Sequence, residues 1–249
     1  VSGSGYTKLG EWDGGAVFTG HNEFNDTGTA RVVQMDSPSD TSWHSTHVAG
    51  TMIAGGVYSN AIGMAYEAEL DAYDWNSDNS EMAAAAANGM EISNHSYGAV
   101  RGWSYGKYSG NTAWHWFGYT PTSEQEDVFF GFYSVATREW DELAYDAPDY
   151  LIVKSAGNDR DDSGPDAGSP GHYVYNYSTG SWDSSDVVRD ADGGDFGYDS
   201  LPQKGTAKNI LTIGAVQEVL DYTGPTDVVM ASFSGWGPAD DGRIKPDVV

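Results

Sequence analysis

Apolar segments alternate with helical patterns along most of the chain. Short apolar runs bounded by Gly, Pro or Asp predict strands at 7–12, 30–35, 69–75, 92–96, 151–153, 210–216 and 228–233. Between the strands, the patterns predict helices at 44–54, 81–87 and 123–147. Strands that alternate with helices favour a parallel sheet that is covered on both faces. We therefore expect an α/β fold with a mainly parallel central sheet.

Two of the predicted helices carry start and stop signals. Ser80 precedes an Ala-rich run that ends at Asn88-Gly89, so Ser80 is predicted to be the N-cap residue. Ser123-Glu124-Gln125-Glu126 matches a capping box, and Pro148 ends the helix that this box opens. The two remaining long segments, which are rich in Gly and in aromatic or acidic residues, are expected to be loops at 98–122 and 159–201.

Composition and charge narrow the possible partners. The chain has 249 residues, enough for a sizeable core, and we expect one domain over 1–249. Its 37 acidic and 12 basic residues give a formal net charge of −25, so we expect neither nucleic acid nor an anionic membrane as a partner. The absence of Cys excludes disulfides, thiolate metal sites and a Cys nucleophile. No apolar run is long enough to predict a membrane span.

The segment 44–51, His-Ser-Thr-His-Val-Ala-Gly-Thr, places two histidines at i and i+3 near the start of a predicted helix. Zinc proteases of the His-Glu-x-x-His type need i, i+4 spacing and an intervening Glu, so His44 and His47 are a poor metal pair. One buried and one solvated histidine is the simpler alternative. Ala49 and Gly50 would let this helix lie close against a sheet.

Asp13 and Asn158 each follow a predicted strand next to glycine. Asp13 precedes Gly14-Gly15, and Asn158 ends the sequence Ser-Ala-Gly-Asn. Taken alone, each is most simply a turn residue. In an acyl-transfer enzyme, the Asn158 amide would instead point at developing negative charge, and Gly157 would let a substrate approach closely.

In their order along the chain, six segments resemble the motifs of the subtilisin-like serine proteases, or subtilases. The segment 44–51 is similar to the histidine motif, although Ser45 stands where the family normally has Gly. Asp13-Gly14-Gly15 is similar to the Asp-Thr-Gly motif, with Gly in its middle position. The other similar stretches are Asn-His-Ser-Tyr-Gly at 94–98, Ser-Ala-Gly-Asn at 155–158, and two segments that normally precede the serine motif, 231–238 and 245–248.

The resemblance implies a subtilisin-like three-layer sandwich and a secreted, extracellular serine endopeptidase that hydrolyses peptide bonds in proteins. It implies that His44 is the general base, that Asp13 orients the imidazole, and that Asn158 stabilises the oxyanion. It assigns the binding of a protein or peptide substrate, paired as an added strand, to Ser96, Tyr97, Gly98, Ala156 and Gly157.

The serine motif of the family is missing from this sequence. Neither Gly-Thr-Ser-Met nor Gly-x-Ser-x-Gly occurs. Ser234 is expected to lie in a structural turn, so we expect the nucleophile beyond Val249, with a C-terminal fragment of the same precursor as a candidate partner. Cleavage, truncation and a serine-free homologue are alternative origins of this arrangement. An inactive peptide- or glycan-binding module and a calcium-dependent adhesion domain are alternative functions.

Two acidic loops are candidates for a structural Ca²⁺ site. The segment Asp190-Ala-Asp192-Gly-Gly-Asp195 alternates carboxylates with turn-forming Gly, and we predict Asp190, Asp192 and Asp195 as ligands. The segment 159–166 is also rich in Asp. A solvated acidic loop is the simpler alternative in so acidic a chain.

Overall fold

The computed structural model describes residues 2–166 and 171–249. The chain divides into two compact units, of which the first comprises residues 1–97 with 139–154 and the second residues 98–138 with 155–249. The sequence predicts one domain over 1–249. The division into two units does not decide whether that prediction is right. Each unit is described by itself below.

The first unit is built on a parallel sheet with the strand order β7-β4-β1-β3-β2. Every pairing between these strands is parallel, which confirms the predicted mainly parallel α/β fold. The central strand β1 is buried along its whole length because it has a neighbour on each side and helices on both faces. The strand bounds are β1 Leu9–Asp13, β2 Val32–Gln34, β3 Leu70–Asp74, β4 Ile92–His95 and β7 Leu151–Ser155.

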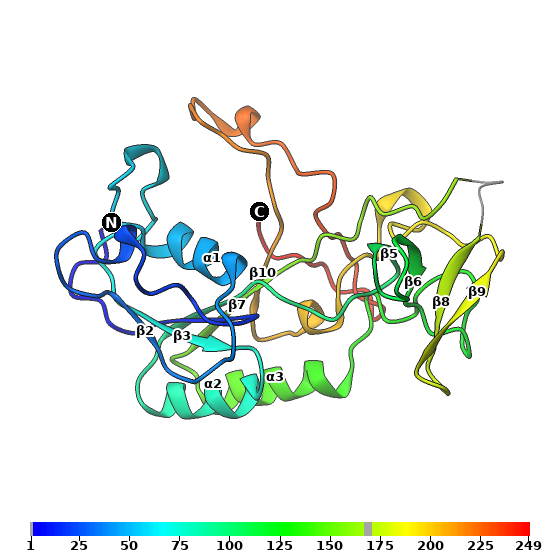
Figure 1. The fold of residues 1–249 in the computed structure, drawn as a ribbon, viewed down its shortest axis with the longest axis horizontal. Coiled ribbons are helices and arrows are strands. Elements are labelled where there is room, and N and C mark those ends of the chain that lie inside the picture. The colour runs from blue at the N-terminus through cyan, green and yellow to red at the C-terminus, as the bar shows by residue number, and fades with distance from the viewer. Residues whose placement is uncertain (1, 167–170) are drawn as a thin grey trace. The chain divides into compact units, whose positions relative to one another are not determined.

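Helices cover both faces of this sheet (Figure 1), with α1 (Trp43–Ile53) on one face and α2 (Asp78–Ala87) and α3 (Val135–Asp146) on the other. Alternation along β1 explains the two layers: Trp12 faces α2 and α3, and Leu9, Glu11 and Asp13 face the opposite side. The apolar core beneath α1 comprises Leu9, Val17, Phe24, Val32, Ala49, Ile53, Ala68, Leu70 and Ala72.

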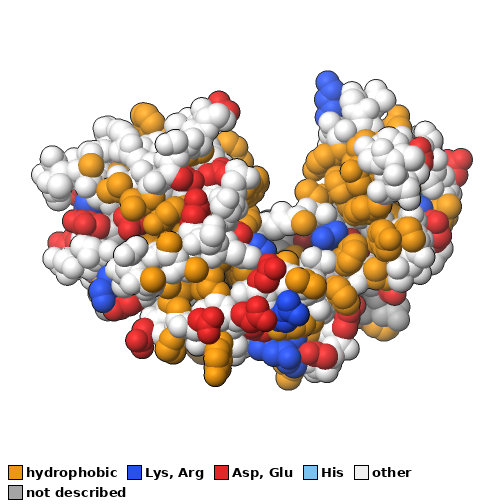
Figure 2. Space-filling view, turned by 90° about the horizontal axis from the view of Figure 1, so that it is seen from below, with side chains coloured by type: hydrophobic (Ala, Val, Ile, Leu, Met, Phe, Trp, Pro, Cys, Tyr) orange, Lys and Arg blue, Asp and Glu red, His pale blue; other side chains and the backbone are white. Residues whose placement is uncertain are grey.

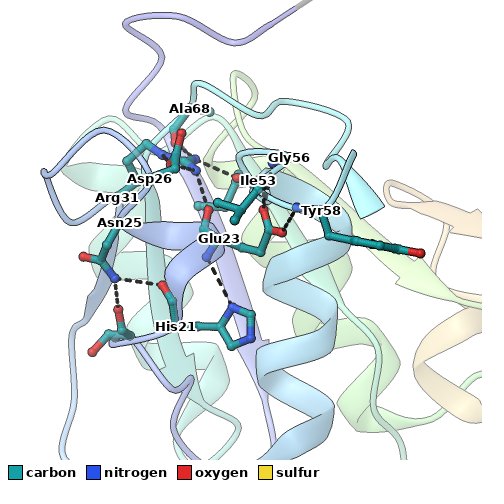
Figure 3. A network of polar contacts seen from close by, with 11 residues as sticks. His21, Glu23, Asn25, Asp26, Arg31, Ile53, Gly56, Tyr58 and Ala68 are labelled. Carbon is teal, nitrogen blue, oxygen red and sulfur yellow. Dashed lines mark hydrogen bonds and ion pairs between the residues drawn. The ribbon is translucent and has the colours of Figure 1, made fainter. Parts of the chain in front are cut away.

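A buried polar network holds the end of α1 in place (Figure 3). The Glu23 carboxylate accepts hydrogen bonds from the backbone N–H groups of Gly56, Val57 and Tyr58 at 2.7–2.9 Å. The Arg31 guanidinium donates to the carbonyls of Ile53 and Glu23 at 2.6 and 2.7 Å. Burial acts to raise the pKa of Glu23, but the three N–H donors outweigh it and the pKa is lowered.

The second unit contains a four-stranded sheet in the order β5-β6-β8-β9. Its strands β5 (Trp103–Gly106) and β6 (Ala113–Trp116) lie within 98–122, and β8 (His172–Asn176) and β9 (Ser181–Ser185) lie within 159–201, so the prediction of two loops was wrong there. Trp103, Trp116 and Val174 form its core. The unit also holds β10 (Leu211–Ile213).

Short 3₁₀ turns occur in both units. Among the described residues they are Asn22–Phe24, Ser59–Ala61, Asp195–Gly197, Gln203–Thr206 and Pro225–Asp227.

Three local predictions were wrong: the helix start at Ser123, the N-cap at Ser80 and the strand at 228–233. The Ser123 hydroxyl does accept from the N–H groups of Gln125 and Glu126, but no helix follows, and α3 begins at Val135. The N-cap position of α2 is Ser77 rather than Ser80. The predicted strand 228–233 is reduced to a single bridge between Val216 and Met230.

Acidic side chains are scattered among apolar ones on the face shown in Figure 2, with few basic residues between them. This distribution fits the net charge of −25. In the described part of the chain, no helix combines the length and the apolar character that crossing a membrane requires.

Candidate active site

Asp13 and His44 lie in direct contact within the first unit. His44 Nδ1 is 2.8 Å from Asp13 Oδ1 and 2.9 Å from Oδ2. Asp13 is buried at the end of β1, whereas the His44 side chain is 43% exposed. A carboxylate can only accept, so Nδ1 carries the hydrogen and Nε2 is left as the acceptor of a neutral imidazole. This arrangement gives the exposed nitrogen the capacity to take a proton from a hydroxyl.

Local hydrogen bonds hold His44 beside Asp13. Ser42 caps α1, since its hydroxyl accepts from the Ser45 N–H at 3.2 Å, and His44 therefore lies in the first turn. The Ser45 hydroxyl is buried and lies 2.9 Å from the carbonyl of Gly15 and 3.4 Å from Asp13 Oδ1. The serine at this position thus ties the helix to the turn after β1, which glycine could not do.

The turn after Asp13 is fixed by the neighbouring strand. Gly15 N–H donates to Asp74 Oδ2 at 2.8 Å, and Asp74 lies opposite Asp13 in the parallel register. A Cβ at Gly14 would lie 2.7 Å from the Trp75 ring, so a larger residue there would require the Trp75 side chain to move. Sequence reasoning missed Asp74, although its position at the end of the strand beside β1 was a usable signal.

Glu11 is a second buried carboxyl on the same face of β1 as Asp13. Its side chain is 0% exposed, and neither carboxyl oxygen has a hydrogen-bond partner in the described structure. Its register neighbours are Ala72 and Asn94. Burial, and secondarily the charge of Asp13, raises the pKa of Glu11 well above its ordinary value. Sequence reasoning gave Glu11 no role.

The predicted substrate-binding residues are divided between the two units. Ser96 and Tyr97 follow β4 in the first unit, and both are partly buried. The Ser96 hydroxyl accepts from the Asn94 amide at 2.9 Å. Gly98 is exposed and belongs to the second unit, as do Ala156 and Gly157.

Asn158 follows a tightly held backbone segment in the second unit. Ala156 N–H donates to the Ile213 carbonyl at 2.8 Å, and the Gly157 carbonyl accepts from Gly235 N–H at 3.1 Å. Gly157 has φ +88°, and a Cβ there would lie 2.9 Å from the Pro202 side chain, so this position requires glycine. Asn158 itself is exposed. The backbone just before Asn158 is therefore anchored by hydrogen bonds.

Ser234 has the environment of a structural residue. It is 0% exposed, and its hydroxyl oxygen accepts from Ala215 N–H at 2.8 Å. A hydroxyl buried in this way cannot reach a peptide substrate.

The acidic loops of the second unit meet at Asp192. Oxygen atoms of Asp159, Asp162 and Asp192 lie within 4.8 Å of one another. Of the predicted ligands, Asp190 is exposed and outside this group, and the Asp195 side chain lies outside the described residues. Burial, together with the neighbouring carboxyls, raises the pKa of Asp192 to about 10 although the Trp103 N–H opposes the shift. The pKa of Asp162 is raised to about 6 by burial and by Asp161.

Comparison with known proteins identifies the fold independently. The self-cleaved protease domain of PatA has a TM-score of 0.50 and 16% identity, with 95% of this chain and 64% of that chain covered. The Clostridium perfringens CspB protease has a TM-score of 0.56 and 13% identity, covering 100% and 75%. The patellamide maturation protease PatA has a TM-score of 0.52 and 16% identity, covering 98% and 65%. The chain thus spans slightly less than two thirds of the PatA structures.

No curated protein matches the chain. The family model described as the subtilase family matches residues 17–249, a span that includes His44 and Asn158 and begins just after Asp13. A model match over nearly the whole length is much more specific than any single motif. The chain belongs to the subtilase family.

Proposed function

We propose that this chain forms the N-terminal and central part of the catalytic domain of a secreted serine endopeptidase. The observation that carries the proposal is the contact between buried Asp13 and half-exposed His44 in a chain of the subtilase family. The nucleophilic serine follows Val249, on the same chain or on a fragment of the same precursor. The substrates are proteins or peptides.

In the proposed mechanism, His44 Nε2 takes the hydroxyl proton of the serine as that hydroxyl attacks the peptide carbonyl. Asp13 keeps the imidazole hydrogen on Nδ1 and stabilises the imidazolium that forms. Asn158 donates its amide to the oxyanion, and His44 then returns the proton to the leaving amine. In the first unit, substrate backbone pairs with the segment at 96–97.

Active-site labelling of the full-length gene product tests this proposal. A fluorophosphonate, which reacts with activated serines, is expected to modify one serine downstream of residue 249 and to abolish hydrolysis of casein. Intact-mass analysis of the same sample shows whether that serine is on the same chain or on a bound fragment. Labelling of Ser234, or casein hydrolysis that persists after complete labelling, would contradict the proposal.

The second unit supports a further proposal, a structural Ca²⁺ site at Asp159, Asp162 and Asp192. Carboxylate oxygens are the hard ligands that Ca²⁺ prefers, and three of them converge here from two loops. Asp192 is buried, and a cation would relieve the repulsion among these groups. The bound ion would join the loop after Asn158 to the loop that carries Asp192.

Millimolar Ca²⁺ is expected to raise the melting temperature of the protein relative to a chelator. An ion present at about 100 times its dissociation constant stabilises by about 2.7 kcal/mol, and in a domain of this size about 1 kcal/mol corresponds to about 2–4 °C. Asp192→Asn should remove the Ca²⁺-dependent increase, whereas Asp190→Asn, the matched control outside the group, should keep it. Equal melting temperatures of the wild type in both conditions would disprove the site.

A further inference from the structure

A chain of hydrogen bonds runs through the first unit beneath the candidate substrate-binding segment. The Tyr97 hydroxyl donates to Asp78 Oδ2 at 2.6 Å, and it lies 3.2 Å from His95 Nδ1. On the other side of the imidazole, His95 Nε2 is 2.7 Å from the Ser93 hydroxyl, which is 2.5 Å from the Tyr150 hydroxyl. His95 and Ser93 are both 0% exposed.

With an ionised Asp78 and a neutral His95 imidazole, the donors and acceptors among these contacts run in one direction. A hydroxyl has one hydrogen, and Tyr97 uses it on Asp78, so Tyr97 must accept from His95 Nδ1–H. In a neutral imidazole Nε2 is then the acceptor, and the Ser93 hydroxyl must donate to it. Ser93 in turn accepts from Tyr150. Each bond therefore determines the next, from Asp78 to Tyr150.

The His95 ring lies near two parts of the candidate active site, namely Asp13 and the segment at 96–98. Its ring stacks on Trp12 at 5.3 Å between centroids, and Trp12 immediately precedes Asp13. Trp140 contacts the ring at 4.9 Å with an edge-on geometry. Tyr97 is two residues further along from His95, in the segment 96–98 assigned to substrate binding. The imidazole thus lies between the strand that ends in Asp13 and the segment expected to pair with substrate.

The geometry points to His95 as a positioning residue, fixed as the neutral tautomer with its proton on Nδ1, that holds Tyr97 and the backbone at 96–97 in place for an extended peptide. Burial and the adjacent Asp78 raise the pKa of Tyr97, which keeps its hydroxyl protonated as this chain requires. Burial likewise raises the pKa of Tyr150. The structural part stands by itself, and the part concerning peptide binding rests on the proposed function.

Two matched Tyr→Phe variants test the inference because each removes one buried hydroxyl from an end of the chain. Tyr97→Phe removes the acceptor that Nδ1–H uses, so the proton should move wholly or partly to Nε2, where Ser93 can accept it. Tyr150→Phe leaves the bonds from Ser93 to Asp78 in place and should leave the tautomer unchanged. The ¹⁵N chemical shifts of the His95 ring report the tautomer directly.

Two further measurements on the full-length protein separate positioning from a merely structural role. Amide hydrogen exchange at residues 96 and 97 should become faster in Tyr97→Phe and not in Tyr150→Phe. KM for a peptide substrate should rise about three- to tenfold in Tyr97→Phe with kcat within about twofold, the loss of one hydrogen bond's worth of binding. In Tyr150→Phe both constants should stay at wild-type values.

A wild-type His95 proton on Nε2, or a Tyr97→Phe variant that behaves like Tyr150→Phe, would overturn the inference. If the full-length wild type hydrolyses no peptide, the proposed function fails, while the tautomer and the amide exchange still decide whether His95 holds Tyr97. The two failures are therefore distinguishable.

Discussion

Replacing His44 with alanine in the full-length protein is expected to lower kcat by a factor on the order of 10⁶, the loss that removing the histidine causes in subtilisin itself. The physical reason is that the imidazole in contact with Asp13 is the group proposed to take the serine proton. The measurement is kcat and KM on peptide substrates with protein shown by circular dichroism to be folded.

His47→Ala is the matched control for this experiment. His47 lies on the same helix three residues later, but it is exposed. The same substitution there should leave kcat within about twofold, as is usual for surface positions away from the site. Wild-type kcat in a folded His44→Ala variant would remove His44 from the mechanism.

In the same assay, Asn158→Ala is expected to lower kcat by about 10²–10³ and barely change KM, because an oxyanion donor acts mainly in the transition state.

Replacing Glu11 with leucine is expected to stabilise the protein, and increasingly so as the pH rises. The carboxyl of Glu11 is buried without a partner and its pKa is raised in the folded state, mainly by burial. The folded protein therefore binds a proton that the unfolded chain releases above its ordinary pKa near 4.3. The stability that Glu11 contributes is fully present below that pKa and is lost as the pH rises towards the folded-state pKa.

Denaturant unfolding at a series of pH values measures this effect. For one proton, the difference in unfolding free energy between Glu11→Leu and wild type should grow by about 1.4 kcal/mol per pH unit in this range. Glu11→Gln should show the same slope with a smaller gain, because it keeps a buried polar group. Glu67→Gln, at an exposed glutamate, serves as the matched control. Parallel curves for wild type and Glu11→Leu would show that Glu11 is paired and ionised.

The parallel sheet could be predicted because its signals are local, and the Asp13–His44 contact because the segments around both residues resemble subtilase motifs. Apolar runs mark β1, β3, β4 and β7, and the histidine segment has a recognisable sequence. The four strands β5, β6, β8 and β9 were missed because they are short, and because the hairpins β5–β6 and β8–β9 form one sheet only through the pairing of β6 with β8. Pairing across so many residues leaves no periodic pattern in a single segment.

Side-chain burial was harder to predict than backbone structure. Ser123 makes a local capping turn that a capping-box pattern describes correctly, yet the residues after it do not continue as a helix. Asp192 was among the predicted ligands, but its partners come from the loop at 159–162 rather than from its own loop. Glu11 received no attention because a charged residue within a strand is normally assigned to the solvent side. For Asp192, the missing information was the contact between its loop and the distant loop at 159–162.

The hydrogen bond from the Ser45 hydroxyl to the turn after β1 joins two segments that are both synthesised early. Asp13, the turn at Gly15, Ser45 and His44 lie within about thirty residues of one another, so closing the loop that joins them has a small entropic cost. Chains emerge from the ribosome N-terminus first, and local contacts form rapidly. Asp13 and His44 can therefore meet long before the segments after β10 are made. Under the proposed function, this pair is in place before the serine is synthesised, so hydrolysis begins only once that serine has joined it.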